Sequence, residues 1–535
     1  MTQTILKDLN KAQQQAVLNT DGPMIILAGA GSGKTRVLTY KVIYLMQEKQ
    51  IAPEHILMVT FTNKAANEMK ERIEKFLPHS PKPLIATFHS LSAKILRIDG
   101  HFLGLSSRFV IYDTQDQQDV VKQAMEFLGL SIKEYKPAAL LGMISQAKNE
   151  LLTPDQYSEY ARGRFQEVAS LVYRTYQRIL KENDALDFDD LIMQTVLLFD
   201  KFPEVLEKYQ TKFHYVLVDE YQDTNKAQYL LTKLLAKKWQ NVCVVGDFSQ
   251  SIYSWRGADF QNLSKFQSDF AHVETFELSQ NYRSSQRILD AASSVIKRNS
   301  THPVLELWTE NPDGDDITIY EAHNEQDEAK FIAGFITNYG TNYKDIAVLY
   351  RTNAQSRILE EVLLHYGIPY VLVGGTRFYE RKEIKDVLAM LRALGNPKDT
   401  VSLKRIEKIG KTRLAKFLAY QAAILGYQPR EENNQEKTEV GPQQATIELL
   451  DQVLEKINYL DLYDENDEED RSRLENIKEL RSVALAFPDL TQFLENVALV
   501  EQEQMPDKPV DGDEKNAVTL MTLHAAKGLE FPVVF

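Results

Sequence analysis

The stretch PMIILAGAGSGKT at residues 23–35 sets an apolar run directly before a glycine-rich turn that ends on a lysine and a threonine. An apolar run followed at once by glycines is typical of a buried strand that enters a tight turn. From Thr35 to about Gln47 the apolar positions recur with helical spacing. The stretch therefore predicts a strand, a turn that a ligand can approach closely, and a helix.

The turn has the composition of a phosphate-binding loop. Its glycines allow backbone N–H groups to converge at the N-terminus of the helix, an arrangement that attracts anions. The pattern Gly-x-x-x-x-Gly-Lys-Thr is met if the small residue Ala28 takes the first position. Lys34 would then bring a positive charge to the β- and γ-phosphates, and the Thr35 hydroxyl would ligate Mg²⁺. The predicted loop residues are Ala28, Gly29, Ala30, Gly31, Ser32, Gly33, Lys34 and Thr35.

Apolar strands and amphipathic helices alternate outward from this loop. A second strand is predicted at residues 55–60 and a second helix at 64–76. Such alternation with short connections indicates a parallel sheet flanked by helices. A second α/β segment begins near Asn281. The other predicted strands are 215–218, 241–245, 316–320, 345–350, 518–522 and 531–535.

Two long blocks break this alternation. Residues 113–183 and 384–500 carry mainly helical patterns, the second with a polar stretch at 429–444. The chain of 535 residues is too long for one hydrophobic core, because such cores stop growing near ~250–300 residues. We therefore expect two α/β domains, each interrupted by a mainly helical insertion.

Composition narrows the classes of protein. No run of 18 uncharged apolar residues and no N-terminal signal core occur, so neither a membrane span nor secretion is predicted. The only cysteine, Cys243, sits in an apolar run, which predicts a buried side chain, excludes an internal disulfide and suits the cytoplasm. The net charge of −14 weakly opposes nucleic-acid binding. Much of the acid, however, lies in two runs at 430–436 and 464–470, typical of solvated loops.

Carboxylates follow another predicted strand, as a phosphate-binding loop requires. Asp219 and Glu220 come directly after the apolar run 215–218. Asp219 would hold Mg²⁺ through water and Glu220 would act as the base for an attacking water, although a plain loop cap is the alternative. Gln250 follows a third strand and could hydrogen-bond a γ-phosphate or its water.

Seven segments in this order resemble the UvrD/Rep/PcrA family of superfamily 1 DNA helicases. They span residues 9 to 531, nearly the whole chain, and their order and spacing make the resemblance specific. The segments are LNKAQ at 9–13, the loop at 28–35, VDEYQDT at 218–224, GDFSQSIYSWRGA at 246–258, LSQNYRS at 278–284, GGTRFYER at 374–381 and MTLHAAKGLEF at 521–531.

The resemblance implies an α/β fold with two RecA-like P-loop motor domains, each carrying a mainly helical insertion. ATP and Mg²⁺ would bind between the motors, and the chain would move 3′ to 5′ along single-stranded DNA. The family places a further arginine-bearing motif beyond these segments, so we expect the second motor domain to be incomplete at residue 535. The implied ranges are 1–107 and 186–279 for the first motor domain, 108–185 for its insertion, 280–380 and 514–535 for the second motor domain, and 381–513 for its insertion.

Matching positions imply roles around the nucleotide. Gln13 would read the adenine, and Tyr282 would stack near it. Arg283 resembles an arginine finger supplied by the second motor domain, Arg36 would lie near the nucleotide, and Glu530 would approach the ribose or phosphates. A finger supplied by the other domain would make hydrolysis depend on domain closure.

The resemblance also implies a DNA-binding set that combines stacking with backbone contacts. For any single aromatic in it, a place in the core is the alternative, and His89 could equally be a surface histidine. Asp187, Asp189 and Asp190 suggest metal ligands, but a helix cap and first turn explains them better. The implied DNA-binding residues are Phe61, Thr62, Asn63, His89, Phe188, Tyr253, Trp255, Arg256, Arg351, Asn353, Thr522 and His524.

Three functions compete at this point. The first is a cytoplasmic 3′-to-5′ DNA helicase that acts on single strands and on junctions with duplex, with repair or replication proteins as possible partners. The second is a chain that binds ATP and single-stranded DNA but turns ATP over poorly. The third, a nucleotide-dependent regulator without nucleic acid, leaves the aromatic and basic motif at 253–256 unexplained.

Overall fold

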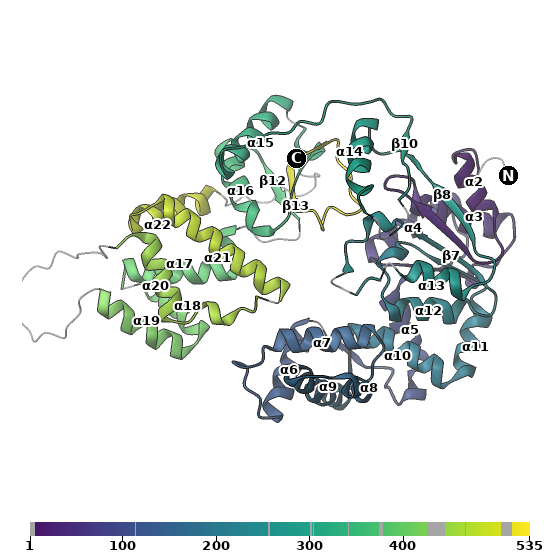
Figure 1. Cartoon of the computed structure of the whole chain (residues 1–535), viewed down its shortest axis with the longest axis horizontal. Helices are drawn as coiled ribbons and strands as arrows, with labels where there is room; N and C mark the ends of the chain where they lie inside the picture. The colour runs from purple at the N-terminus through teal and green to yellow at the C-terminus, as the bar shows by residue number, and fades with distance from the viewer. Residues whose placement is uncertain are drawn as a thin grey trace, which may run out of the picture. The chain divides into compact units, whose positions relative to one another are not determined.

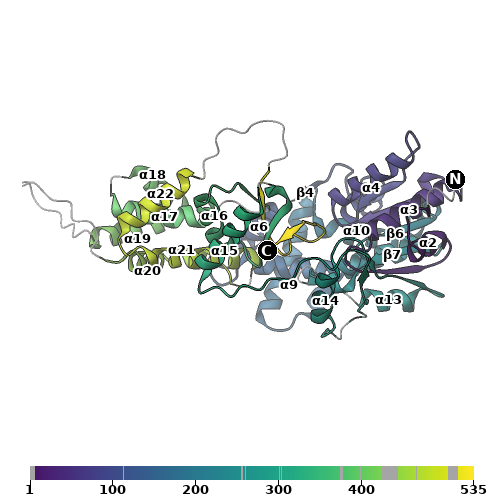
Figure 2. The same ribbon diagram turned by 90° about the horizontal axis from the view of Figure 1, so that it is seen from above.

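The computed structural model describes residues 6–535 except 113, 255–256, 260, 300–301, 303, 341, 374–377, 398, 425–443, 466 and 504–515. It consists of two compact units, Met1–Thr318 and Ile319–Phe535 (Figure 1). Each unit contains its own sheet of parallel strands (Figure 2). Within the described residues, no helix is long and apolar enough to cross a membrane.

The first unit is built on a six-stranded sheet whose neighbouring strands are all parallel. The spatial order is β3-β2-β6-β7-β1-β8. The predicted strands at 23–28, 55–60, 215–218 and 241–245 are confirmed, whereas β3 and β8 were not predicted. The bounds are β1 (Met24–Ala28), β2 (Ile56–Thr60), β3 (Leu84–Thr87), β6 (Tyr215–Val218), β7 (Asn241–Gly246) and β8 (Glu274–Leu278).

Helices cover both faces of this sheet, which explains why its central strands are continuous apolar runs. Successive side chains of a strand point to opposite faces. Ile25 packs into a core with α5 (Phe88–Asp99) and α10 (Phe188–Lys201). Ile26 packs into another with α3 (Lys34–Gln47) and its neighbours. The remaining helices of this α/β part are α2 (Lys11–Leu18), α4 (Asn63–Phe76), α11 (Pro203–Lys212), α12 (Lys226–Ala236), α13 (Asn262–Asp269) and α14 (Gln286–Ile296).

The helical block predicted after residue 113 is present and has a core of its own, centred on Tyr173 and Tyr176. Two three-residue strands, β4 (Val110–Tyr112) and β5 (Ala185–Asp187), pair in parallel where the chain enters and leaves the block. They are too short to give a periodic signal in the sequence. The helices are α6 (Thr114–Phe127), α7 (Pro137–Asn149), α8 (Pro154–Tyr160) and α9 (Arg164–Glu182).

The second unit has a four-stranded parallel sheet in the order β12-β13-β11-β14. Its strands are β11 (Ile346–Tyr350), β12 (Tyr370–Leu372), β13 (Val518–Thr522) and β14 (Val533–Val534), with α15 (Glu325–Tyr339) and α16 (Ser356–His365) beside them. A separate helical core follows. Its helices are α17 (Lys382–Gly395), α18 (Thr400–Ile409), α19 (Lys411–Ile424), α20 (Thr446–Lys456), α21 (Glu468–Ala486) and α22 (Leu490–Glu503).

One predicted strand is wrong. Residues 316–320 alternate polar and β-branched side chains, yet they form no strand. Ile317 is 53% exposed and Ile319 is 91% exposed, so neither side chain gains the burial that stabilises a strand. β-propensity reflects packing on a sheet, and this segment has no neighbouring strand to pair with.

Candidate nucleotide and DNA-binding sites

The glycine-rich loop joins β1 to α3, as the sequence predicts. Gly31 (φ 64°) and Gly33 (φ 83°) adopt the left-handed conformation, which is costly for residues with a Cβ. The Ser32 backbone N–H and hydroxyl both donate to the Gly29 carbonyl, at 3.2 and 2.7 Å. These contacts hold the loop at the N-terminus of α3, where backbone N–H groups favour an anion.

A second segment packs directly on the loop. The Asn281 side chain donates to the Ala30 carbonyl at 2.6 Å. A Cβ placed on Gly31 would lie 2.7 Å from Asn281 Nδ2 and 2.8 Å from Arg283 Cβ. Arg283 therefore stands beside the loop, and its role as an arginine finger stays a prediction.

Lys34 lies at the centre of the site and contacts residues from two other strands. Its Nζ is 3.5 Å from Glu220 Oε1 and 3.3 Å from Gln250 Oε1. β6, β7 and β1 are neighbours, and the carboxyl ends of parallel strands meet at one edge of a sheet. The topology thus brings Lys34 into contact with two residues, Glu220 and Gln250, that each lie more than 180 positions away in the sequence.

The two predicted magnesium residues, Thr35 and Asp219, contact each other. Thr35 Oγ1 and Asp219 Oδ2 are 3.1 Å apart. Adjacent ligands of an octahedral Mg²⁺ are separated by about 2.9 Å, given metal–oxygen distances near 2.0–2.1 Å. Among the described residues, no group of three or more His, Cys, Asp or Glu could hold a metal. The pair thus fits a magnesium ion that takes its remaining ligands from phosphates and water.

The electrostatics favour a cation at the same point. Burial, and then the neighbouring charge of Glu220, raise the pKa of Asp219 to about 7. Two adjacent carboxylates repel one another when both are ionised, and a divalent cation relieves that repulsion.

The residues that are expected to surround the adenine lie close together near the start of α2. Gln13 and Asn10 form a reciprocal capping box, and the Gln13 side chain also donates to the Ser32 carbonyl at 2.9 Å. The Asn10 side chain donates to the Tyr282 hydroxyl at 2.8 Å. Arg36 donates to the backbone carbonyl of Asp8 at 2.8 Å. Gln13, Tyr282 and Arg36 are therefore gathered beside the loop, and their nucleotide roles stay predictions.

Several predicted DNA-binding residues gather at the same sheet edge, beyond β2 and β3. The rings of His89 and Phe188 meet edge to face at 5.8 Å, and Phe61 meets Phe88 in the same way at 5.8 Å. The Thr62 hydroxyl caps α4 by accepting from Ala65 N–H. Burial lowers the pKa of His89, so this side chain is neutral at pH 7 and offers a ring and a hydrogen bond rather than a charge.

The second unit brings its own predicted residues to one sheet edge. Tyr350 pairs with Thr522 at the carboxyl ends of β11 and β13, and Arg351 and Asn353 follow within three residues. His524 lies two residues after β13, and Glu530 is exposed farther along the same segment. Tyr253, in the first unit, accepts a backbone hydrogen bond from Ala258. Trp255, Arg256 and the side chain of Asn63 lie outside the described residues.

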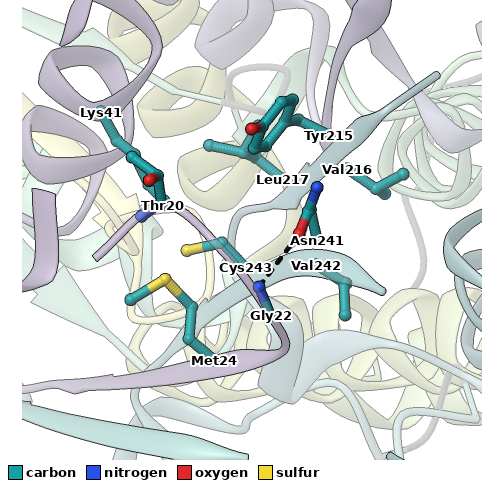
Figure 3. Close-up of a pocket in the computed structure, with 10 residues that line it drawn as sticks. All are labelled: Thr20, Gly22, Met24, Lys41, Tyr215, Val216, Leu217, Asn241, Val242 and Cys243. Atoms are coloured by element: carbon teal, nitrogen blue, oxygen red, sulfur yellow. Dashed lines mark hydrogen bonds between the residues drawn. The ribbon is translucent and has the colours of Figure 1, made fainter. Parts of the chain in front are cut away.

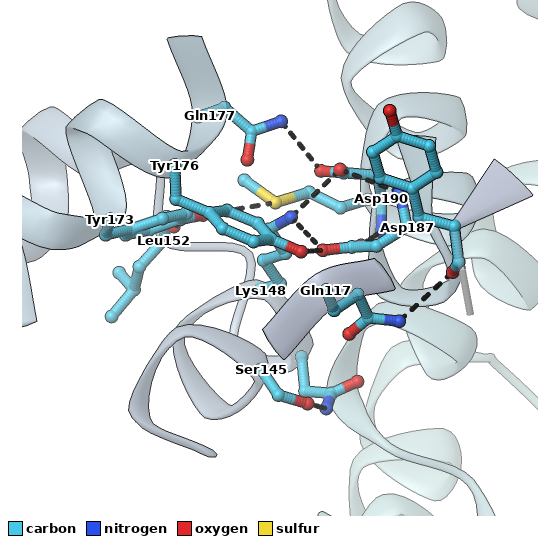
Figure 4. A network of polar contacts seen from close by, with 12 residues as sticks. Gln117, Ser145, Lys148, Leu152, Tyr173, Tyr176, Gln177, Asp187 and Asp190 are labelled. Carbon is cyan, nitrogen blue, oxygen red and sulfur yellow. Dashed lines mark hydrogen bonds and ion pairs between the residues drawn. The ribbon is translucent and has the colours of Figure 1, made fainter. Parts of the chain in front are cut away.

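The three aspartates at 187–190 lie in the N-cap and first turn of α10, as predicted. Asp187 is the N-cap of α10 and forms a capping box with Asp190. The buried ammonium of Lys148 lies 2.6 Å from Asp187 and 2.9 Å from Asp190 (Figure 4). Burial alone would lower the pKa of Lys148, but the two carboxylates together raise it. The network ties α7 of the helical block to α10, which begins with Phe188.

A pocket elsewhere in the sheet contains none of the predicted site residues. It lies where β1, β6 and β7 begin, at the edge opposite the glycine-rich loop (Figure 3). Lys41 beside it donates to the Ala16 carbonyl at 3.1 Å. Cys243 is buried as predicted, and burial raises the pKa of its thiol to about 11.

Two polar residues of the site, Asn10 and Gln222, were not predicted as site residues from the sequence. Asn10 is the N-cap of α2, and its spacing to Gln13 is a capping-box signature that the sequence already contains. Gln222 is fully buried between Glu220 and Asp247. The contacts of Gln222 with Glu220 and Asp247 form only because the end of β7 lies beside the end of β6, and a local sequence pattern does not reveal which strands are neighbours.

Comparison with known proteins agrees with this geometry. Residues 9–271 match the UvrD/REP helicase N-terminal domain, and residues 276–535 match the UvrD-like helicase C-terminal domain. The ATP-dependent DNA helicase PcrA of Bacillus subtilis (strain 168) is 47% identical over 570 residues, which covers 99% of this chain and 77% of that protein. PcrA of Staphylococcus epidermidis (RP62A) and of Staphylococcus aureus (Mu50) are each 44% identical over 576 residues, with the same coverage. Because family models match both halves of the chain and the PcrA relatives are 44–47% identical over nearly all of it, this chain belongs to the UvrD/REP family of helicases.

Proposed function

We propose that the chain is an ATP-dependent DNA helicase that hydrolyses ATP between two RecA-like domains while it moves 3′ to 5′ along single-stranded DNA. The observation that carries the proposal is the convergence of Lys34 with Glu220 and Gln250, within 3.5 Å, at the sheet edge that also holds the His89–Phe188 ring pair. The PcrA relatives, named ATP-dependent DNA helicases, support the assignment.

Each residue near the loop has a role in phosphoryl transfer. Lys34 neutralises the terminal phosphates, and Glu220 orients the attacking water and takes its proton. Arg283, beside Gly31, stabilises charge on the γ-phosphate as a finger. Thr35 and Asp219 would hold Mg²⁺, which would supply positive charge to the β- and γ-phosphates.

Gln250 is the element that couples nucleotide to DNA in this proposal. Its carboxamide accepts from Lys34 at 3.3 Å and donates to Asp247 at 2.8 Å, and these contacts beside Lys34 support a role next to the γ-phosphate. The same segment continues to Tyr253 and Trp255, which are proposed to stack on bases. Loss of the γ-phosphate would therefore shift the segment that holds DNA.

The domain ranges given above, junctions of single- and double-stranded DNA as substrates, and repair or replication proteins as partners belong to the same proposal. A cytoplasmic location is part of it as well, supported by DNA as the substrate and by a single, buried cysteine.

ATP hydrolysis by the 535-residue chain, with and without single-stranded DNA, tests the proposal. We expect DNA to stimulate turnover, and Lys34→Ala to abolish it. Lys49→Ala is a matched control, because Lys49 is an exposed lysine just beyond the other end of the same helix. DNA binding without turnover in the unaltered chain would instead support the alternative of an ATP- and DNA-binding protein.

Polarity needs a separate measurement. Duplexes with either a 3′ or a 5′ single-stranded tail should be unwound only when the 3′ tail is present. Unwinding from 5′ tails alone would contradict the proposed direction.

A further inference from the structure

Gln222 links the candidate catalytic base to the segment that senses the γ-phosphate. It lies in the short turn Tyr221–Asp223 after β6 and is fully buried. Its Nε2 donates to Glu220 Oε2, and its Oε1 accepts from the backbone N–H of Asp247 at 3.0 Å. The Gln222 carboxamide therefore hydrogen-bonds both to the side chain of Glu220, which follows β6, and to the backbone of Asp247, which follows β7.

The neighbouring glycine leaves room for this carboxamide. A Cβ on Gly246 would lie 2.7 Å from Gln222 Oε1 and 3.3 Å from Gln222 N. Gly246 is not among the residues with positive φ, so its backbone does not require glycine. The Gln222 carboxamide occupies the space that a side chain at position 246 would fill.

The disfavoured backbone conformation of Glu220 requires contacts from other residues to stabilise it. Glu220 adopts the left-handed conformation (φ 52°, ψ 42°), which residues with a Cβ disfavour. Such strain persists only where surrounding contacts fix it, and it gathers at functional sites. The Gln222 carboxamide fixes one carboxylate oxygen of Glu220, and Lys34 lies 3.5 Å from the other.

We propose that Gln222 is a positioning residue that transmits movement of the 247–250 segment to the carboxylate of Glu220. Gln250 donates two hydrogen bonds to Asp247, one from its side chain at 2.8 Å and one from its backbone at 2.9 Å. A shift of Gln250 therefore also moves Asp247, whose backbone N–H donates to Gln222. The inference rests on the proposed function. Hydrolysis then proceeds only when the segment that faces the γ-phosphate is in place.

Three substitutions separate this role from simple burial of a polar side chain. Gln222→Met keeps the length and removes both hydrogen bonds. Gln222→Glu can still accept from Asp247 but cannot donate to Glu220 and adds a like charge. Gly246→Ala leaves the glutamine intact and displaces its carboxamide.

Steady-state hydrolysis of ATP by the full chain, at saturating single-stranded DNA, is the readout. We expect each variant to lower kcat by about 10- to 100-fold, the cost of misplacing a reacting group by roughly 1 Å. The KM for ATP should stay within about 3-fold, because the contacts of the loop with ATP are unchanged.

Two controls match the substitutions. Gln228→Met removes another buried glutamine of the same unit, one that only caps α12. Gly142→Ala adds a methyl group in α7 where nothing lies within 4 Å. Both should retain kcat, and thermal unfolding identifies any variant that fails to fold. Gly246→Ala then carries the test if Gln222→Met is unstable.

The outcomes distinguish the two claims. Absence of turnover in the unaltered chain contradicts the proposed function and the inference with it. Normal turnover that Gln222→Met and Gly246→Ala leave unchanged contradicts the inference alone. An equal loss in Gln228→Met, or a rise in KM as large as the fall in kcat, also overturns it.

Discussion

Phe188 is a large aromatic side chain at the first position of α10, and it remains 46% exposed although residues 190–193 of the same helix are buried. Its ring meets that of His89 edge to face. An exposed aromatic held in place by a second ring provides a rigid surface on which a base can stack. The physical setting of Phe188 therefore agrees with its predicted contact to DNA.

Phe188→Ala should weaken binding of single-stranded DNA by about 1–3 kcal/mol, or roughly 5- to 150-fold in Kd, since that is the value of one base–aromatic stack. The affinity for ATP should not change. Fluorescence anisotropy with an oligo-dT measures the first, and a fluorescent ATP analogue measures the second.

Trp239→Ala is the control for this prediction. Trp239 is 41% exposed and precedes β7, at the opposite edge of the sheet, so its removal should leave DNA binding unchanged. Equal losses in the two variants would argue against a stacking role for Phe188.

At the scale of elements, α7 and α10 are joined by a buried cluster in which one ammonium faces two carboxylates. Lys148, Asp187 and Asp190 are all nearly inaccessible to solvent, and Tyr176 donates to Asp187 at 2.8 Å. Removing one partner of a buried pair leaves an uncompensated charge, which costs more than the pair itself contributes. The cluster thus fixes the helical block to the helix that carries Phe188.

Lys148→Met should lower the local stability of α7 and α10 by about 3–5 kcal/mol, the usual cost of breaking a buried pair. Native-state hydrogen exchange of the amides in these two helices measures it. Lys122→Met, which removes an exposed pair with Asp119 at 2.8 Å on α6, should change stability by less than about 1 kcal/mol. Similar effects of both substitutions would mean that the buried cluster has no special role.

The same cluster predicts a pH dependence. Burial, and then the charge of Asp187, raise the pKa of Asp190 to about 7, above its unfolded value near 3.9. A raised carboxyl pKa stabilises the fold below the unfolded pKa, and this contribution is lost as pH rises from about 4 through about 7. Asp190→Asn should reduce that slope in the exchange of α10, most of all between about pH 6 and 7, because burial also raises the pKa of Asp189 to about 6. An unchanged slope in the variant would assign it to another group.

At the scale of the whole molecule, the sequence predicted the elements that local pattern determines. The strand, turn and helix around residues 23–47 are confirmed, with α3 starting at Lys34 instead of Thr35. β8 was missed because Glu274 and Glu277 on this edge strand interrupt its apolar pattern. Residues 316–320 were wrongly predicted because alternation alone does not supply a neighbouring strand.

The residues of the candidate site also fall into those that motifs predict and those that depend on the order of the strands in the sheet. Lys34, Thr35 and Asp219 could be identified from motifs, since each follows a strand that the sequence reveals. The place of Gln222 depends on β7 lying beside β6, which is a property of the sheet order. The function could be predicted because the series of motifs, in a fixed order, identifies several residues of the site that are distant in the sequence.

The central claim is that nucleotide and DNA sites are coupled, and measuring their linkage tests it most directly. The Kd for single-stranded oligo-dT would be determined with ADP and with a non-hydrolysable ATP analogue, and the Kd of each nucleotide with and without DNA. We predict a change of about 5- to 150-fold between the two nucleotide states, with the same factor in the reciprocal measurement. Equal affinity for DNA in both states would contradict the account.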